Sequence, residues 1–222
     1  MNNTDSTKGT VGVLRVLTQD PEATAVHGSI IEERYPQLET VSRCIDDHPD
    51  GIPTVEAERA ALPYVKSLAR EMADQVDTLA ISCALDPAVE SLQKELSIPV
   101  IGAGRAVSHA ALSLGDKVGT IGLEAGDPPI VTETLGASHH ASRQVQGAET
   151  TNFLTTDDGR SAIEATANAL VEDGCTVIAP VCTGITTSGV VPSLRESIEV
   201  PVVDPVESMG ALATLVARGS SD

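Results

Sequence analysis

The chain alternates short apolar runs of strand length with longer stretches in which apolar residues recur at helical spacing. Residues 10–17 (TVGVLRVL) form the first continuous apolar run, of the kind that is buried in a parallel sheet. Helix signals follow at residues 22–34, and residues 38–45 predict the second strand. An amphipathic pattern then predicts a helix over residues 55–73. This alternation of strands and helices indicates an α/β protein.

The same alternation continues along the rest of the chain. We expect further strands at residues 79–83, 100–102, 117–123, 141–147, 176–182 and 198–204, and further helices at residues 88–96, 105–114, 157–172 and 206–218. The Val-Gly step at Val118 repeats the one at Val11 and marks a restart of the pattern. Repeated strand–helix units of this kind predict parallel sheets with helices on both faces.

Two segments repeat one pattern, and each ends in a cysteine. Residues 78–83 (TLAISC) lead through a helical stretch to a strand that is entered through Pro99. Residues 176–182 (TVIAPVC) lead in the same way to a strand that is entered through Pro201. The two cysteines are 99 residues apart in the sequence, and the two prolines are 102 residues apart. A duplicated α/β unit therefore accounts for most of the chain.

The duplication predicts two pseudo-symmetric halves with a cleft between them. We assign residues 1–104 and 206–222 to the first half and residues 105–205 to the second. In open parallel sheets, ligands bind beyond the carboxyl ends of the strands. Cys83 and Cys182 both stand at strand ends, so one sulfur is expected on each side of the cleft. For either thiol alone, a role as a small buried hydrophobic residue stays open, but it is a weaker account of a repeated pair.

Charge and composition narrow the class of partner. The 222 residues carry a net charge of −18 and include two tyrosines, one phenylalanine and no tryptophan. Such a chain repels phosphate backbones and lacks aromatic platforms for bases, so we expect no nucleic-acid partner. The acidic residues are spread along the whole chain, which is typical of proteins that stay soluble in concentrated salt. We therefore expect a halophilic host, with an ordinary acidic enzyme as the alternative.

The sequence also bears on location and on the state of the thiols. No apolar run approaches the roughly 20 residues of a membrane helix, and the polar start lacks the apolar core of a signal peptide. We expect a cytoplasmic protein with no membrane partner. The four cysteines form no CxxC pair, so we expect reduced thiols and no metal site. Cys175 is expected to pack in the core, whereas Cys44 ends a strand that could also face the cleft.

The stretches around the two cysteines carry the most specific motifs of the chain. Residues 82–88 (SCALDPA) are followed by residues 98–106 (IPVIGAGRA) and 108–115 (SHAALSLG), and residues 181–184 read VCTG. Together they resemble the aspartate/glutamate/hydantoin racemase superfamily, and the hydantoin racemases in particular. The resemblance covers nearly the whole chain and implies two flavodoxin-like halves. It also implies a small-molecule substrate, and we expect a homo-oligomer.

This resemblance implies a cofactor-independent racemase or epimerase that acts at a carbon next to a carbonyl. A base removes the proton from one face of the carbon, and an acid returns a proton to the other. Cys83 and Cys182 would exchange these roles, each with a thiol pKa lowered by a following helix N-terminus. The substrate is expected to be hydantoin-like or amino-acid-like. Aspartate and glutamate are disfavoured as substrates. Amino-acid racemases of this family carry Asn-Thr after the first cysteine, where this chain has Ala84-Leu85, and a polar residue after the second Cys-Thr, where it has Gly184.

Several neighbours of the cysteines are candidates for substrate binding. The backbone amides of Ala84, Thr183 and Gly184 would stabilise the enolate-like charge. The hydroxyls of Ser82 and Thr183 would add further donors. Asp86 would orient a substrate N–H or, equally, cap the helix that starts beside it.

Charged and imidazole side chains elsewhere are weaker candidates. Arg15 and Arg43 lie near strand ends and would hold a substrate carboxylate, with a plain ion pair as the alternative for each. His109 is expected to pack or to form a local hydrogen bond rather than to act as a general base. His139 and His140 are expected in a loop without metal partners.

No cofactor is expected, and two other functions stay open. Gly102 and Gly104 resemble part of a dinucleotide fingerprint, but the third glycine is missing. The first alternative is a cis–trans isomerase similar to the maleate isomerases, with one nucleophilic cysteine. The second is a non-catalytic small-molecule binding protein with a hinge between its halves.

Overall fold

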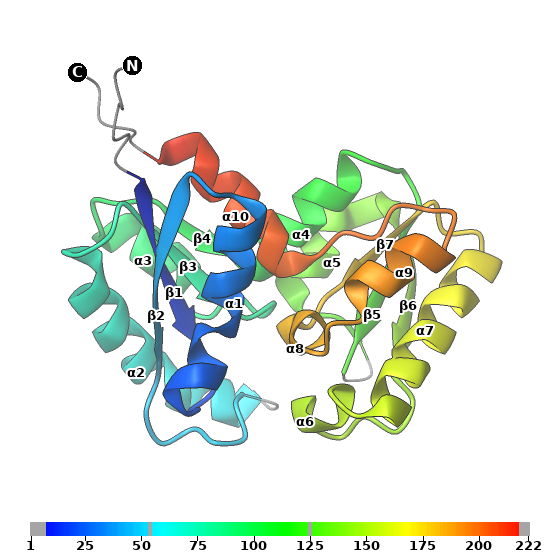
Figure 1. Cartoon of the computed structure of the whole chain (residues 1–222), viewed down its shortest axis with the longest axis horizontal. Coiled ribbons are helices and arrows are strands. Elements are labelled where there is room, and N and C mark those ends of the chain that lie inside the picture. Colours follow the sequence, from blue (N-terminus) through cyan, green and yellow to red (C-terminus); the bar gives the residue numbers. More distant parts are fainter. Residues whose placement is uncertain (1–7, 53–54, 124–125, 218–222) are drawn as a thin grey trace, which may run out of the picture. The chain divides into compact units, whose positions relative to one another are not determined.

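The protein consists of two compact α/β units. The computed structural model describes residues 8–52, 55–123 and 126–217 (Figure 1). The first unit comprises Met1–Ile81, Pro87–Ile101 and Met209–Asp222, and the second comprises Ser82–Asp86 and Gly102–Ser208. The predicted boundaries put residues 82–86, 102–104 and 206–208 in the first half, whereas the structure groups them with the second unit. Cys83, which was predicted in the first half, therefore belongs to the second unit.

A four-stranded sheet forms the centre of the first unit. Its strands are β1 (Gly9–Arg15), β2 (Leu38–Cys44), β3 (Thr78–Ser82) and β4 (Val100–Gly102), in the order β2-β1-β3-β4. β1 and β2 pair in parallel from Gly9 opposite Leu38 to Arg15 opposite Cys44. The helices that connect them are α1 (Pro21–Arg34), α2 (Val55–Ala73) and α3 (Val89–Glu95). The central strands β1 and β3 are buried almost throughout because they are covered on both faces, whereas β2, at the edge of the sheet, is largely polar and only partly buried.

Two helices show how both faces of this sheet are covered. Gly28 of α1 lies against Thr40 and Ser42 of β2, where a side chain at Gly28 would overlap both hydroxyls. Met72 of α2 faces the Cα of Gly12 in β1, on the opposite side of the sheet. The sheet is therefore the middle layer between α1 and α2.

The second unit repeats this design with a three-stranded parallel sheet. Its strands are β5 (Val118–Gly122), β6 (His139–Gln144) and β7 (Val177–Pro180), in the order β6-β5-β7. A parallel bridge from Ile178 to Val202 adds a neighbour beyond β7. The order β6-β5-β7 followed by Val202 thus corresponds to β2-β1-β3-β4, as the duplication predicts.

Helices and two apolar clusters surround the second sheet. The helices are α4 (Ala103–Leu112), α5 (Pro129–Leu135), α6 (Thr151–Leu154), α7 (Asp157–Glu172), α8 (Thr183–Thr187) and α9 (Val191–Ser197), with a 3₁₀ turn η1 (Gly136–Ser138). Helix α10 (Pro205–Val216) begins in this unit, but from Met209 onward it belongs to the first unit, where Gly210 lies against Ile31 and Tyr35. Ile121 and Ile178 pack with α7 and α9 on one face. Val118 and Ala179 pack with α4 and α5 on the other. Ala84, from the loop after β3, belongs to this second cluster, which explains why its segment groups with the second unit.

The predicted fold class is confirmed, and most element boundaries agree within a few residues. Helices α5, α6 and α9 were not predicted, because each has seven residues or fewer and shows no sustained helical period. The strand predicted at residues 198–204 is reduced to the bridge at Val202. The loop predicted at His139 and His140 is wrong, since both residues begin β6.

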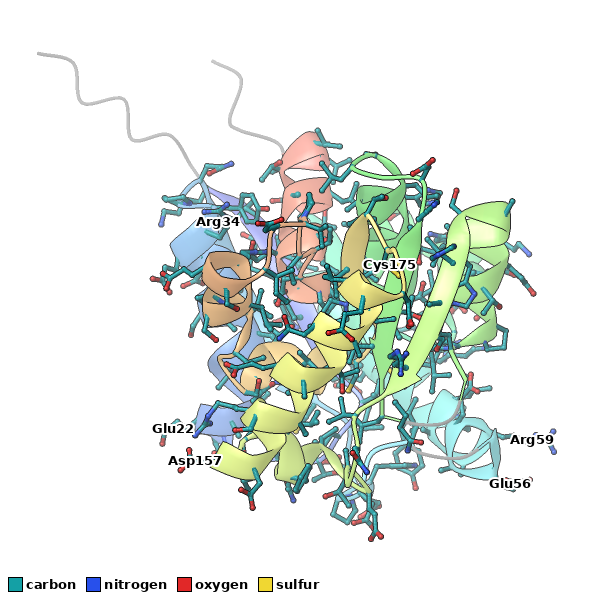
Figure 2. The ribbon with its side chains drawn as sticks, turned by 90° about the vertical axis from the view of Figure 1, so that its right-hand side faces the viewer. Glu22, Arg34, Glu56, Arg59, Asp157 and Cys175 are labelled. Carbon is teal, nitrogen blue, oxygen red and sulfur yellow. The ribbon has the colours of Figure 1, made fainter. Side chains whose placement is uncertain are left out.

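Many of the acidic residues that give the chain its net charge of −18 are exposed on the surface. Glu22, Glu56 and Asp157 are exposed at the ends of helices and extend away from the ribbon, as Figure 2 shows. Several arginines are paired with carboxylates, including Arg143 with Asp173 at 2.7 Å. Among the described residues, we find no helix with the length and apolarity that a bilayer crossing requires.

Candidate active site

The first cysteine lies in a tight turn at the end of β3. Cys83 is half-buried and directly follows Ser82, the last residue of the strand. The N–H of Asp86 donates to the Cys83 carbonyl at 3.1 Å and closes the turn. Asp86 and Ala88 both have left-handed backbones, with φ of +52° and +63°. Helix α3 begins at Val89, one residue from its predicted start, so its N-terminus lies several residues beyond Cys83.

Asp86 ties this turn to a different helix. Its side chain is buried and accepts the N–H of Gly104 at 2.7 Å and that of Arg105 at 2.9 Å, in the first turn of α4. Asp86 therefore caps a helix that starts 17 residues further along the chain, and not the one beside it. Burial raises the pKa of the carboxyl to about 6, against the opposing effect of the two N–H donors and of Arg105. Contact of Asp86 with a substrate stays a prediction.

The turn also rests directly on the backbone of α4. A Cβ at Gly104 would overlap the carbonyl oxygen of Ala84, and a Cβ at Gly102 would overlap the carboxyl group of Asp86. Glycine is thus required at both positions because the Cys83 turn occupies the space of a side chain. The Gly-x-Gly pattern serves this close packing.

The second cysteine lies at the start of a short helix. Cys182 follows β7 and is the N-cap residue of α8, with the extended backbone typical of that position. It is half-buried and packs at the edge of the apolar cluster around Ile121. Gly184, in the first turn of α8, is buried with its Cα facing Thr151 and Leu154. The prediction of a helix directly after Cys182 is confirmed.

One hydrogen bond joins the two cysteine segments. The Thr183 hydroxyl, next to Cys182, donates to the Ser82 carbonyl, next to Cys83, at 3.4 Å. Both segments belong to the second unit. Ser82 and Thr183 are 101 positions apart in the sequence but are neighbours in the structure. Each is adjacent in the chain to one of the two predicted catalytic cysteines.

The two candidate arginines belong to the first unit and have protein partners. Arg15 is 5% exposed and donates to the carbonyl of Ala23 in α1 at 3.2 Å. Arg43 is half-exposed and forms an ion pair with Glu71 at 3.0 Å. The ion-pair alternative thus describes Arg43, and for both residues a contact with substrate stays a prediction.

The remaining thiols and His109 have other surroundings. Cys175 is buried in the apolar cluster of the second unit, where burial raises its thiol pKa, so its predicted structural role is confirmed (Figure 2). The Cys44 thiol lies 3.5 Å from the Gln19 carbonyl in the first unit. His109 is exposed on α4, away from the core.

A buried carboxylate that the sequence analysis missed lies between β5 and β6. Asp127, whose side chain is 1% exposed, accepts a hydrogen bond from Thr120 at 2.5 Å and one from Ser142 at 3.0 Å. The His139 ring nitrogen lies 2.7 Å from the same carboxylate. The cluster fixes the chain before α5. His139 and Ser142 are three residues apart, and the β6 register shifts between them, so the sequence shows no simple alternation that would have revealed the cluster. No group of three metal-binding side chains occurs in the described ranges.

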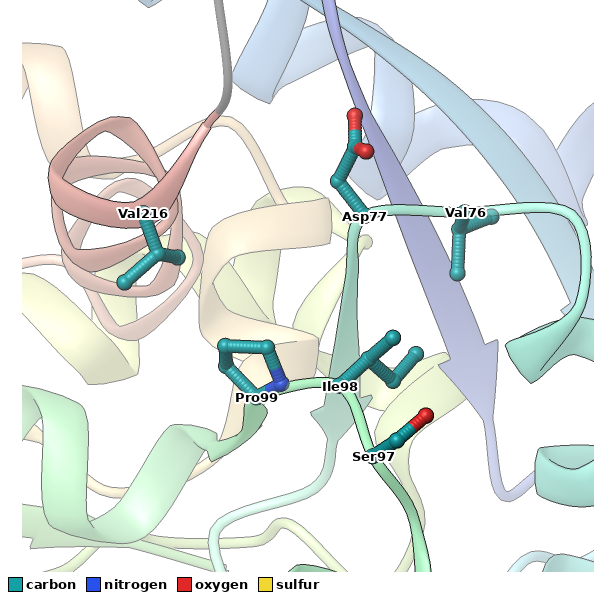
Figure 3. Close-up of a pocket in the computed structure, with 6 residues that line it drawn as sticks. All are labelled: Val76, Asp77, Ser97, Ile98, Pro99 and Val216. Carbon is teal, nitrogen blue, oxygen red and sulfur yellow. The ribbon is translucent and has the colours of Figure 1, made fainter.

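A cavity lies at the opposite end of β3 from Cys83. It has a volume of about 520 Å³ and is lined by residues that precede β3 and β4 and by the end of α10: Val76, Asp77, Ser97, Ile98, Pro99 and Val216 (Figure 3). Asp77 immediately precedes the first residue of β3, whereas Cys83 follows its last. This cavity is therefore separate from the cysteine site, and it lacks a thiol.

Comparison with known proteins agrees with these observations. The Asp/Glu/hydantoin racemase family profile matches residues 22–213. Allantoin racemase from Klebsiella pneumoniae superposes with a TM-score of 0.78 at 22% identity over 96% of this chain and 91% of that one. Allantoin racemase from Pseudomonas fluorescens superposes with a TM-score of 0.75 at 21% identity, over 96% of this chain and 93% of that one. A glutamate racemase from Bacillus anthracis superposes with a TM-score of 0.63 at 16% identity, over 94% of this chain and 82% of that one.

These solved structures share the fold of the chain at low sequence identity. No curated protein matches the sequence significantly. The family profile spans most of the chain and includes both cysteine segments. The chain therefore belongs to the Asp/Glu/hydantoin racemase family and is an isomerase of the racemase type.

Proposed function

We propose that this protein is a cofactor-independent racemase or epimerase in which Cys83 and Cys182 are the two acid–base groups. The observation that carries this proposal is the hydrogen bond from Thr183 to Ser82, which joins the two segments that hold the thiols. Both thiols are half-buried, so neither is enclosed in the core as Cys175 is. The other two cysteines lie elsewhere, in the core and in the first unit.

The proposed reaction is a proton exchange at one carbon. One cysteine, as the thiolate, takes the proton from a carbon next to a carbonyl, and the electron pair moves onto the carbonyl oxygen as an enolate. The other cysteine, as the thiol, then gives its proton to the opposite face of the carbon. The protein ends with the thiol and thiolate exchanged, so the reverse direction uses the same groups.

Backbone donors around the thiols are proposed to stabilise the enolate oxygen. Cys182 as the N-cap places Thr183 and Gly184 in the first turn of α8, where N–H groups have no partner within the helix. Such donors in a desolvated site are worth up to about 3–4 kcal/mol each at the transition state. The amide of Ala84 has the matching place after Cys83.

We propose a 5-substituted hydantoin as the substrate class, with allantoin as the first compound to test. Two of the similar solved structures are allantoin racemases. A hydantoin carbon between a carbonyl and a nitrogen carries an acidic proton and needs no charged anchor for an amino-acid carboxylate. Ala84 and Gly184 next to the cysteines provide no such anchor.

The test is solvent exchange with enantiopure allantoin in deuterated, high-salt buffer. We expect loss of optical rotation together with deuterium at the stereocentre, at a rate well above that without enzyme. Cys83→Ser and Cys182→Ser should each abolish racemisation, with a loss of at least about 10³-fold. Cys44→Ser serves as the matched control and should keep the parent rate. Full racemisation by either site variant would contradict the two-base mechanism.

A single-nucleophile reaction like that of the maleate isomerases is the second candidate. The observation in its favour is that only Cys182 directly precedes a helix, so the two thiols have unlike surroundings. In that reaction one thiolate adds to the double bond of an unsaturated diacid, and rotation and elimination then return the thiolate. Incubation with maleate followed by intact-mass measurement would show an adduct that Cys182→Ser lacks. Absence of both adduct and isomerisation would exclude this reaction.

A further inference from the structure

The two copies of the duplicated pattern cap corresponding helices with a buried carboxylate. In the first copy, Asp86 accepts the N–H groups of Gly104 and Arg105 in α4. In the second, Asp204 accepts those of Val206 at 2.7 Å and Glu207 at 2.9 Å in α10. Gly104 and Val206 are 102 residues apart, and so are Arg105 and Glu207. The capped amides are thus equivalent positions in the two copies.

The carboxylate, however, comes from different places in the two copies. Asp204 is the residue just before α10, which is the ordinary position for a capping side chain. The residue 102 positions earlier is Gly102, the N-cap of α4, which has no side chain. A Cβ at Gly102 would overlap the carboxyl group of Asp86. In the first copy, the turn that follows Cys83 therefore supplies the capping carboxylate, in place of the residue just before the helix.

The position of the capping carboxylate affects the turn that holds the Cys83 thiol. A carboxylate at position 102 would cap α4 without contacting the Cys83 turn. Placed at position 86, it caps the same helix and also ties the turn to that helix, because Asp86 belongs to the turn that its own backbone N–H closes onto the Cys83 carbonyl. The turn contains two residues with left-handed backbones, which need such support to persist.

We propose that Asp86 is a positioning residue that holds Cys83 in place by capping α4, and that capping alone does not explain its location. This inference rests on the proposed catalytic role of Cys83. Asp86 does not need to touch the substrate. The copy that holds Cys182 is arranged differently: its carboxylate comes from Asp204 next to α10, outside the segment that follows Cys182, and it interacts with α8 through the side chain of Thr186.

A double variant separates capping from positioning. Asp86→Ala removes both effects. Asp86→Ala combined with Gly102→Asp restores a cap at the position used by Asp204, since Gly102 has the extended N-cap backbone (φ −102°, ψ 142°) and the overlapping carboxyl group is gone. Hydrogen exchange followed by mass spectrometry reports on residues 82–88 and 103–112 separately, and thermal melting reports on the whole fold.

We expect Asp86→Ala to lower the melting temperature by roughly 2–6 °C and to speed exchange in both segments. In the double variant, the melting temperature and the protection of α4 should return, while residues 82–88 continue to exchange on the order of 10-fold faster than in the parent protein. With allantoin, kcat should stay reduced by up to about 10²-fold and KM should change little. If the double variant recovers both the protection of residues 82–88 and the parent kcat, the proposal is overturned.

Two controls complete the design. Asp86→Asn suits the left-handed backbone and still accepts one N–H, so its exchange should fall between the parent and Asp86→Ala. Asp204→Ala removes the equivalent cap and should lower the melting temperature without changing exchange in residues 82–88. Hydrogen exchange is measured without substrate, so it tests the positioning role of Asp86 independently of the racemase activity. The exchange result can contradict the positioning role while allantoin is still racemised, and it can support that role even if allantoin is not a substrate.

Discussion

Lowering the pH from about 7.5 to about 4.5 is expected to stabilise this protein relative to its Asp86→Asn variant. The cause is the burial of Asp86, which raises the pKa of its carboxyl in the folded protein to about 6, from 3.8 for the unperturbed group. Between these two pH values the folded state binds more protons at this site than the unfolded state. Stability therefore falls as the pH rises through this window.

The size of the effect follows from the two pKa values. A difference of about two pKa units corresponds to about 3 kcal/mol once both states are ionised, and about 2 kcal/mol of this develops between pH 4.5 and 7.5. The residue is 9% exposed, so solvent screening removes little of it. The Asn variant does not titrate at this position, and comparison with it cancels the other carboxylates.

Urea denaturation of both proteins at matched high salt measures the effect. The difference in unfolding free energy between the parent and Asp86→Asn should shift by about 2 kcal/mol across this pH window, in favour of the parent at low pH. Parallel curves would refute the reasoning. They would mean that the N–H groups of Gly104 and Arg105, at 2.7 and 2.9 Å, outweigh the cost of desolvation and keep the carboxyl ionised.

Three further predictions concern packing, surface charge and salt. Gly104→Ala should destabilise the fold by several kcal/mol in chemical denaturation and lower allantoin turnover, because the new methyl group overlaps the Ala84 carbonyl; unchanged stability would contradict the packing of the Cys83 turn on α4. Arg43→Ala should change stability by less than about 1 kcal/mol, since its pair with Glu71 is half-exposed, and a large rise in KM would instead give Arg43 a role in substrate binding. The melting temperature should rise steadily between low and molar KCl, because salt screens the repulsion within a chain of net charge −18; a flat response would remove the halophilic interpretation.

Local sequence determined the class of fold and the place of the thiols along the chain. Continuous apolar runs such as Val11–Leu14 specify buried parallel strands, because both faces of those strands are covered. Helix α7 agrees with its prediction from Asp157 to Glu172, and α2 from Val55 to Ala73, since long amphipathic periods leave little freedom. The repeated strand–cysteine pattern placed Cys83 and Cys182 at corresponding strand ends, and the sheet orders of the two units repeat accordingly.

Only the tertiary structure decided which residues surround the thiols. Thr183 meets Ser82, and Asp86 meets α4, through contacts between residues 101 and 18 positions apart, for which no local pattern exists. Asp86 has the sequence features of a cap for the helix beside it, yet the left-handed turn directs its carboxylate to another helix. Short helices such as α5 and the strand that begins at His139 were missed for the same reason. Periodic burial is visible in sequence because it repeats, whereas a single long-range hydrogen bond depends on how distant segments pack and leaves no period to detect.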